Sequence, residues 1–531
     1  MRDKPVQRVA ALVVLFLAVV AWETLAEDGG MKARPTVLLV TIDTIRADRL
    51  GCYGYDRGTT PVIDRLAGEG LLFREAVTTV PLTTPSHATI LTGLHPRGHA
   101  VLGNSWQLEP SCRTLAQRFR DAGYRTAAFV SAVVLDPRCG LDAGFDHYGA
   151  LTRPGPNTVR RSPLSAGAAD SVRERERSDR LSGRQRRGAE TVEEALAWLE
   201  AQPGDAPLFV WVHFYDPHQP FDPLPPWRQK FGRDRGGRNL STVLHMPIPG
   251  NEFEESDERA RREIEVRRQR HAARGRAPRS MLTTESLTPD ERRRIDELYD
   301  GEVAATDFQV GRLLNWFERS GLYRDAIVAL VGDHGETLGE HLDGYYGHHH
   351  VLFDSSLLVP LIIRLPGGAG GTVVQPTAGT ADLAPTLLRA AGLTVPSGLD
   401  GRDLLAGPRS RPLYCETYLG VRPGRIPPEF ERNRFPAQQP FGIHAHAFRD
   451  GRWKLVLDSS KASSPQLFDL EADPGEQTDV ADTHQALVRA LTTQWQRWCE
   501  AHELPRRTRS RRDESGDEAM REKLRQLGYV E

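Results

Sequence analysis

The hydrophobic pattern of the chain alternates short apolar runs with longer segments of helical period. Residues 37–42, 208–214 and 327–331 form almost unbroken apolar runs of strand length, which is typical of strands buried on both faces. Residues 126–130 and 361–364 are two further strand candidates. Because strands and helices alternate, we predict an α/β fold with a mostly parallel central sheet.

Three helices are predicted between these strands from the residues at their ends. One begins near Pro61 and stops at Gly70, and another begins near Pro85 and stops at Gly93. Proline suits the first turn of a helix, and glycine suits the position just beyond its last turn. The longest helix is predicted at residues 289–319, where apolar residues recur at helical spacing.

Near residue 405 the pattern changes to short strands of alternating polarity. Residues 445–449 and 453–458 flank Asp450-Gly451, which is a strong β-hairpin signal. A closing helix is predicted at residues 483–500. We therefore predict a smaller α+β subdomain with an antiparallel sheet. The predicted parts of the chain are a large domain at residues 35–404, this subdomain at 405–505 and a charged tail at 506–531.

The amino-acid composition argues against a nucleic-acid-binding protein and against a disulfide-rich scaffold. The 69 Lys and Arg residues nearly balance the 71 Asp and Glu residues, so the charge gives no reason to expect a nucleic-acid partner. Residues 152–187 and 228–286 are rich in Arg, Glu, Gly and Ser and read as solvated insertions. Five cysteines are too few for a disulfide scaffold, although Cys112 and Cys139 could form a bridge or remain isolated thiols.

The N-terminus resembles a secretory signal. Arg2, Lys4 and Arg8 precede an apolar run at residues 9–22, and small residues follow. We expect cleavage after residue 26 and an exported protein, periplasmic or extracellular, with no membrane span. The alternative is an uncleaved anchor, but the run is shorter than the roughly 20 residues that a spanning helix needs.

Three predicted strands run directly into metal-binding residue types. Asp43 follows the first of them, Asp216 and His218 follow the second, and Asp333 and His334 follow the third. Parallel strands bind ligands at their carboxyl ends, so these side chains can converge. Carboxylate and imidazole groups suit a divalent cation such as Ca²⁺, Mn²⁺, Mg²⁺ or Zn²⁺. The alternative is that they only cap helices and turns.

A candidate nucleophile precedes the helix predicted at Pro85. The hydroxyls of Thr83 and Thr84 lie where the free N–H groups of a helix start favour an anion such as sulfate or phosphate. A metal ion would lower the pKa of such a hydroxyl. Helix capping by threonine is the alternative.

These motifs together resemble the sulfatases of the alkaline phosphatase superfamily. The C-terminal segments 467–470 and 473–476 are similar to that family's ending. The resemblance extends from about residue 35 to residue 481, outside the two insertions. The motifs that carry it in the large domain are residues 35–43, 85–93, 216–220, 332–336 and 359–363.

The resemblance implies an alkaline-phosphatase-like sandwich and a metal-dependent hydrolase of sulfate or phosphate esters. Its substrate would be a small-molecule, glycan-linked or lipid-linked anionic ester. Asp43, Asp333 and His334 match the family's metal ligands, with Ca²⁺, Mn²⁺ or Zn²⁺ as the ion. Thr83 matches the nucleophile, and His218 matches a histidine that contacts the ester or protonates the leaving group.

The chain departs from the family pattern at the nucleophile itself. Sulfatases convert a cysteine to formylglycine, whereas this chain has Thr83, which excludes that chemistry. His87 replaces the usual arginine and could hydrogen-bond the nucleophile or simply pack in the helix. Thr44 replaces the second of two adjacent aspartates.

A threonine nucleophile leaves several functions open. It resembles the nucleophile of the superfamily's phosphodiesterases and of its phosphoglycerol and phosphoethanolamine transferases. Asp216, His218 and either His348 or His349 could hold a second metal or contact substrate. Loss of catalysis, leaving an ester-binding protein, is the remaining alternative.

Overall fold

The computed structural model describes residues 34–104, 106–150, 185–204, 206–232, 240, 287–341, 345–348, 351–368, 370–407, 411–418, 444–458 and 465–502. The predicted signal, the charged tail and most of both predicted insertions lie outside these ranges. None of the helices in the described ranges is long and apolar enough to cross a membrane.

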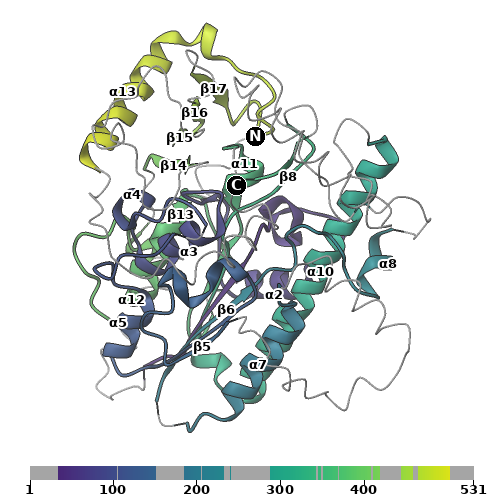
Figure 1. Ribbon diagram of the computed structural model, residues 1–531, viewed down its shortest axis with the longest axis vertical. Helices are drawn as coiled ribbons and strands as arrows, with labels where there is room; N and C mark the ends of the chain where they lie inside the picture. Colours follow the sequence, from purple (N-terminus) through teal and green to yellow (C-terminus); the bar gives the residue numbers. More distant parts are fainter. Residues whose placement is uncertain are drawn as a thin grey trace, which may run out of the picture.

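An eight-stranded sheet forms the centre of the large domain (Figure 1). Its order is β12-β2-β11-β7-β1-β6-β4-β5, and every neighbouring pair is parallel except the two pairs that β11 makes with β7 and β2. The predicted α/β class with a mostly parallel sheet is therefore confirmed. The strands are β1 (Val37–Ile42), β2 (Leu71–Phe73), β4 (Arg125–Val130), β5 (His147–Gly149), β6 (Leu208–Phe214), β7 (Ile327–Gly332), β11 (Leu361–Arg364) and β12 (Thr372–Val374).

Helices cover both faces of this sheet, which explains why its strands read as unbroken apolar runs. Along β1, Leu39 faces one apolar cluster and Val40 faces the other. The helices α3, α5 and α12 lie on the side of Leu39, and α2, α7 and α10 lie on the side of Val40 (Figure 1). Their bounds are α2 (Pro61–Glu69), α3 (Thr83–Thr92), α5 (Leu115–Asp121), α7 (Gly188–Glu200), α10 (Pro289–Arg319) and α12 (Leu383–Ala390).

The ends of α10 match the prediction, and the start of α3 does not. Thr288 and Glu291 form a capping box at the start of α10. The helix α3 begins at Thr83, two residues before the predicted start, so Thr83 lies in its first turn. The physical reason is that Pro85 occupies the third position, where a missing N–H costs no helical bond.

The C-terminal part contains an antiparallel four-stranded sheet, as predicted. Asp450 pairs with Trp453 across the expected hairpin. The helix α13 (Gln485–Ala501) packs Leu491 and Trp495 against Phe448 of this sheet. The strands are β14 (Leu413–Tyr418), β15 (His444–Asp450), β16 (Trp453–Asp458) and β17 (Gln466–Asp469).

All five cysteines are free thiols, so Cys112 and Cys139 are not bridged. The short elements are β3 (Ala76–Val77), β8 (Thr337–Leu338), β9 (Tyr346–Gly347), β10 (Leu358–Val359), β13 (Ala378–Gly379), α4 (Pro96–His99), α8 (Trp227–Phe231) and α11 (Asp354–Leu357).

Candidate active site

The candidate site lies at the carboxyl ends of β1, β6 and β7, which are neighbours in the sheet. Ile42 is in register with Phe214 of β6 and with Gly332 of β7. The N–H of Asp43 donates to the Phe214 carbonyl at 2.8 Å, and the N–H of Asp333 donates to the Ile42 carbonyl at 3.2 Å. The sheet register therefore places Asp43 and Asp333 side by side.

Asp43, Asp333 and His334 converge as the sequence predicts. The Nε2 atom of His334 lies 3.6 Å from Oδ1 of Asp43 and 3.6 Å from Oδ2 of Asp333. All three side chains are fully buried, and one ligand atom from each lies within 4.8 Å of the others. Two carboxylates and one imidazole at these separations can share one divalent cation.

The electrostatics of this group also fit a cation. Both carboxylate oxygens of Asp43 and Oδ2 of Asp333 are buried without a hydrogen-bond partner of normal geometry, although the nearby Thr83 side chain lowers the pKa of Asp43 slightly. Burial raises the pKa of Asp43 and of Asp333 well above the usual range, and their mutual repulsion adds to the rise for Asp43. A bound cation would satisfy these oxygens and favour their charged form.

Thr83 is the threonine that faces this group. Its Oγ1 atom lies 3.5 Å from Nε2 of His334. The Thr84 hydroxyl instead donates to the Val134 carbonyl, and the Thr84 N–H donates to Asn104. Thr83 therefore presents a hydroxyl to the candidate metal ligands, whereas Thr84 fixes the start of the helix.

Thr44 occupies the position of the family's second aspartate. Its φ of 50° is left-handed, a conformation that costs a β-branched residue about 1–3 kcal/mol. This turn directs the Thr44 N–H to Oδ1 of Asp333 at 3.2 Å, and the Thr44 carbonyl accepts from Tyr299. The backbone at position 44, rather than its side chain, supports the candidate site.

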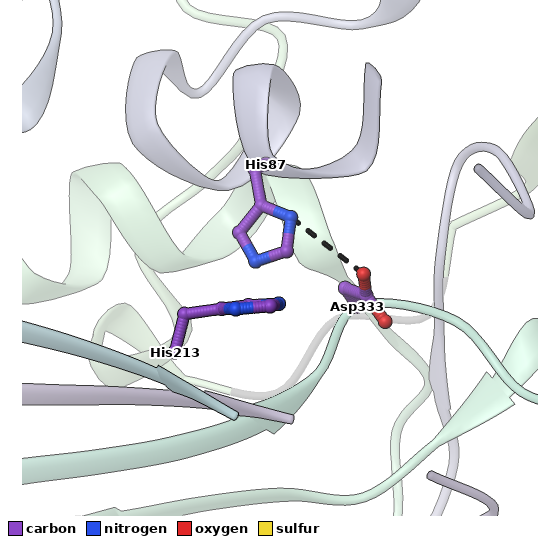
Figure 2. A group of neighbouring side chains, drawn as sticks. All are labelled: His87, His213 and Asp333. Atoms are coloured by element: carbon purple, nitrogen blue, oxygen red, sulfur yellow. Dashed lines mark ion pairs between the residues drawn. The ribbon is translucent and has the colours of Figure 1, made fainter. Parts of the chain in front are cut away.

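His87 is held by hydrogen bonds at both ring nitrogens. Its Nδ1 lies 2.8 Å from the Thr83 carbonyl, and its Nε2 lies 3.0 Å from Oγ1 of Thr41. Burial lowers the pKa of His87 to about 4, so the ring is neutral at pH 7. Figure 2 shows the ring above His213. Nδ1 of His87 lies 3.6 Å from Oδ2 of Asp333. His87 therefore contacts Thr83 through the backbone carbonyl and adds no positive charge.

His218 lies at one end of a row of imidazoles. The ring of His348 lies 4.4 Å from that of His334 and 5.2 Å from that of His218. Oε1 of Glu336 lies 3.2 Å from Nδ1 of His348. Burial raises the pKa of Glu336 to about 8 and lowers that of His218. The row extends the site from the candidate metal ligands toward the loop after β6.

Asp216, which the sequence suggests as a second-metal or substrate residue, is hydrogen-bonded to the start of α7. Its Oδ2 accepts from the N–H of Gly188 at 2.7 Å, so it satisfies a free donor in the first turn of α7. His349 lies outside the described residues. Among the residues that the structure describes, the two groups close enough to share one ion are Asp43-Asp333-His334 and His87-His213-Asp333. Neither includes His218 or His348.

Two buried site residues escape the sequence analysis. His213 is the sixth residue of β6, and alternation places it on the same face as Trp211. A histidine near the carboxyl end of a buried strand is the signal that could have identified it. Glu336 follows Asp333-His334-Gly335, and an added Cβ at Gly335 would lie 2.1 Å from the Ser355 carbonyl. Gly335 therefore packs against the backbone of Ser355, which fixes the position of the chain just before Glu336.

The chain is similar in sequence and in fold to several known proteins. The chain is 25% identical over 484 residues to an arylsulfatase of Clostridium perfringens, covering 85% of this chain and 91% of that protein. It is 26% identical over 518 residues to the multifunctional alkaline phosphatase superfamily protein PehA of Trinickia caryophylli, covering 88% and 96%. The fold matches the crystal structure of the phosphonate monoester hydrolase of Agrobacterium radiobacter with a TM-score of 0.65, 24% identity and coverage of 88% and 96%.

Family models match nearly the whole described chain. The C-terminal model of N-sulphoglucosamine sulphohydrolase matches residues 339–500. The Sulfatase model matches residues 35–393, which contain Asp43, Thr83, Asp333 and His334. The predicted family and its hydrolase class are thereby confirmed: the chain belongs to the Sulfatase family.

Proposed function

We propose that this protein is a metal-dependent hydrolase of sulfate or phosphate esters that uses Thr83 as its nucleophile. The observation that carries the proposal is the convergence of the Thr83 hydroxyl with three buried ligand-type side chains. Thr83 Oγ1 is 3.5 Å from His334 Nε2, which is 3.6 Å from both Asp43 and Asp333. A hydroxyl is a weak nucleophile unless a neighbouring group activates it. The proposed metal ligands beside Thr83 would place such an activating group next to its hydroxyl.

Asp43, Asp333 and His334 would hold the divalent cation. A cation there lowers the pKa of a neighbouring hydroxyl and offsets negative charge on the ester oxygens. Thr83 lies in the first turn of α3, where the helix dipole adds partial positive charge. The metal ion and the helix start would together supply the positive charge that the family's arginine provides and that neutral His87 does not.

The reaction would proceed by two displacements. The Thr83 oxygen, after losing its proton to solvent, forms a bond to sulfur or phosphorus while the bond to the leaving oxygen breaks. His218 gives that oxygen a proton. Water then attacks the Thr83 ester, returns a proton to His218 and releases Thr83 together with sulfate or phosphate. Proton transfer by a placed histidine contributes about 10²- to 10⁴-fold.

The hydrogen bonds of His218 suit this proton transfer. Its Nδ1 lies 2.5 Å from the Gln219 carbonyl, which can only accept, so Nδ1 carries a proton. Nε2 is then the atom that gains and loses the second proton. Burial favours the neutral ring, and the negative charge of a bound ester acts in the opposite direction.

A substrate panel with two variants tests the proposal. Metal-stripped protein is assayed with aryl sulfate, phosphate monoester, phosphodiester and phosphonate monoester, and again after adding Mn²⁺, Ca²⁺ or Zn²⁺. Thr83→Val, which removes the hydroxyl at similar volume, should lower kcat by more than about 10³-fold. Thr83→Ser is the matched control and should retain metal-dependent turnover. Unchanged turnover by Thr83→Val would show that another group is the nucleophile.

The panel also distinguishes the alternatives. A requirement for an acceptor alcohol would identify a transferase, and binding without turnover would identify an ester-binding protein. The names of related proteins support the choice of esters, because one is an N-acetylglucosamine-6-O-sulfatase of Bacteroides thetaiotaomicron. Sulfated sugars therefore belong in the panel. We also propose export of the chain, which cleavage after residue 26 would demonstrate.

A further inference from the structure

His213 ends in a fully buried donor atom that the proposed reaction leaves unused. It is 0% exposed, and its Nε2 atom has no hydrogen-bond partner. The nearest carboxylate oxygen is Oδ2 of Asp43, at 3.8 Å. Figure 2 shows the ring extending from β6 toward Asp333, beneath His87. Such an atom either binds a metal ion or donates a hydrogen bond.

The hydrogen bond at the other nitrogen of His213 decides between these roles. The backbone N–H of Ser131 donates to Nδ1 at 3.3 Å, and a backbone N–H cannot accept. Nδ1 is therefore unprotonated, and in the neutral ring the proton lies on Nε2. A nitrogen that carries a proton cannot bind a metal ion, so Nε2 is a donor.

His87 is excluded as a metal ligand by the same reasoning. Its Nδ1 donates to the Thr83 carbonyl, so its Nε2 accepts from the Thr41 hydroxyl. That hydroxyl accepts in turn from Nε1 of Trp211 at 2.9 Å. Both nitrogens of His87 are thus occupied by protein groups. The proximity of His87, His213 and Asp333 does not make them a second metal site.

The two metal-binding carboxylates divide their oxygens in the same way. Oδ1 of Asp333 accepts from the N–H groups of Thr44 and His334, while Oδ2 lies toward the imidazole of His334. Oδ1 of Asp43 lies toward that imidazole, while Oδ2 lies toward His213. In each carboxylate one oxygen lies toward His334, the third proposed ligand, and the other lies toward an N–H donor.

We propose that His213 is a positioning residue that donates Nε2–H to Oδ2 of Asp43 and so presents Oδ1 to the metal ion. A rotation of the Asp43 carboxylate closes the 3.8 Å separation to hydrogen-bond length. The proposal rests on the proposed metal site at Asp43, Asp333 and His334. It also gives Asp43 side-chain support at a site where Thr44 supplies no second carboxylate.

Two substitutions test the roles of the two ring nitrogens of His213 separately. In His213→Gln the side-chain amide reaches about as far as Nε2 and can still donate to Asp43. In His213→Asn the amide reaches only the position of Nδ1, so it can accept from Ser131 but not reach Asp43. Mn²⁺ affinity is measured on the full chain from the EPR signal of free Mn²⁺, and thermal melting verifies folding. His213→Asn should weaken affinity 10- to 100-fold, whereas His213→Gln should remain within about threefold.

Electron spin echo modulation of the Mn²⁺-loaded wild-type protein supplies a second readout. It counts directly bound imidazole nitrogens, and we expect one, from His334. Two bound nitrogens would make His213 a ligand and overturn the proposal, as would equal Mn²⁺ affinity in wild type and His213→Asn. If wild type itself binds no Mn²⁺, Ca²⁺ or Zn²⁺, the proposed metal-dependent function fails first and this inference with it.

Discussion

Two groups of buried carboxylates in this protein have opposite electrostatic environments. Asp43 and Asp333 lie at the end of the central sheet. In the described part of the chain, the basic side chains within 4.0 Å of their carboxylates are all histidines. Asp354, at the start of α11, lies between Lys454 Nζ at 2.8 Å and Arg449 at 2.7 Å. Both cations of the second group come from the C-terminal sheet.

The pKa shifts follow this difference. Burial raises the pKa of Asp43 and Asp333. Burial also acts on Asp354, but Arg449 and Lys454 overcome it and lower the pKa. A buried carboxylate with its cations in place ties two parts of the chain together. The buried pair Asp43 and Asp333 has no such cation among the described side chains, which supports our proposal that a metal ion binds there.

The largest expected effect comes from removing charge at the first group. Asp333→Asn should abolish metal-dependent turnover, on the order of 10³-fold or more, because a metal ion contributes several kcal/mol of transition-state stabilisation. The same change should leave the melting temperature of metal-free protein unchanged or higher, since it removes repulsion from Asp43. Steady-state kinetics and melting curves measure both. If Asp333→Asn instead lowered the melting temperature and kept normal turnover, Asp333 would serve stability and not the reaction.

Removing charge from the second group should act on stability instead. Lys454→Met leaves Asp354 and Glu476 buried beside Arg449 without their shared partner. Breaking a buried ion pair costs about 3–5 kcal/mol, which denaturant unfolding would detect. Turnover per folded molecule should stay near that of wild type. A loss of turnover without a loss of stability would place Lys454 in the active site.

The stabilisation of the folded protein by added metal ion should depend on pH, because it acts through Asp43 and Asp333. A carboxyl whose folded pKa is raised contributes stability below its unfolded pKa and loses it as pH rises through the folded pKa. Metal-free protein should therefore lose this contribution from Asp43 and Asp333 as pH rises. Added Mn²⁺ should raise the melting temperature more at pH 8 than at pH 5, by several degrees. An equal rise at both pH values would contradict the predicted ligands.

The smallest effect is expected at an exposed ion pair. Arg324 and Asp325 are 83% and 69% exposed and lie 3.1 Å apart. Asp325→Asn should change the free energy of unfolding by less than about 0.5 kcal/mol, because water screens such pairs. This variant is the control for Lys454→Met in the same unfolding assay. If Asp325→Asn lowered the free energy of unfolding as much as Lys454→Met, burial of the ion pair would not be the reason for the large effect at Lys454.

Much of the fold and part of the site could be predicted from the sequence. The central strands were predictable because both of their faces are covered, which leaves unbroken apolar runs. Asp43 and Asp333 follow two of those strands directly, so sheet register alone brings them together. The choice of Thr83 over Thr84 needed the family resemblance, because both precede Pro85.

The remaining site residues depend on side-chain direction, which sequence spacing does not give. Asp216 follows the same strand as His218, yet it turns away to satisfy the free N–H of Gly188. His213 lies within an apolar run, and its role depends on a hydrogen bond from Ser131 that connects β6 to the end of β4. The start of α7 and the loop after β4 cannot be located from apolar pattern alone.

The hydrogen-bonded series Trp211, Thr41, His87 and the Thr83 carbonyl limits which side chains fit at position 87. An arginine at position 87 has no acceptor atom, so it could not take the Thr41 proton that His87 accepts. An arginine at position 87 would therefore leave the buried Thr41 hydroxyl without the acceptor that His87 provides, although Trp211 could still donate to it. Position 87 is thus coupled to Thr41 in the central sheet as well as to the Thr83 carbonyl.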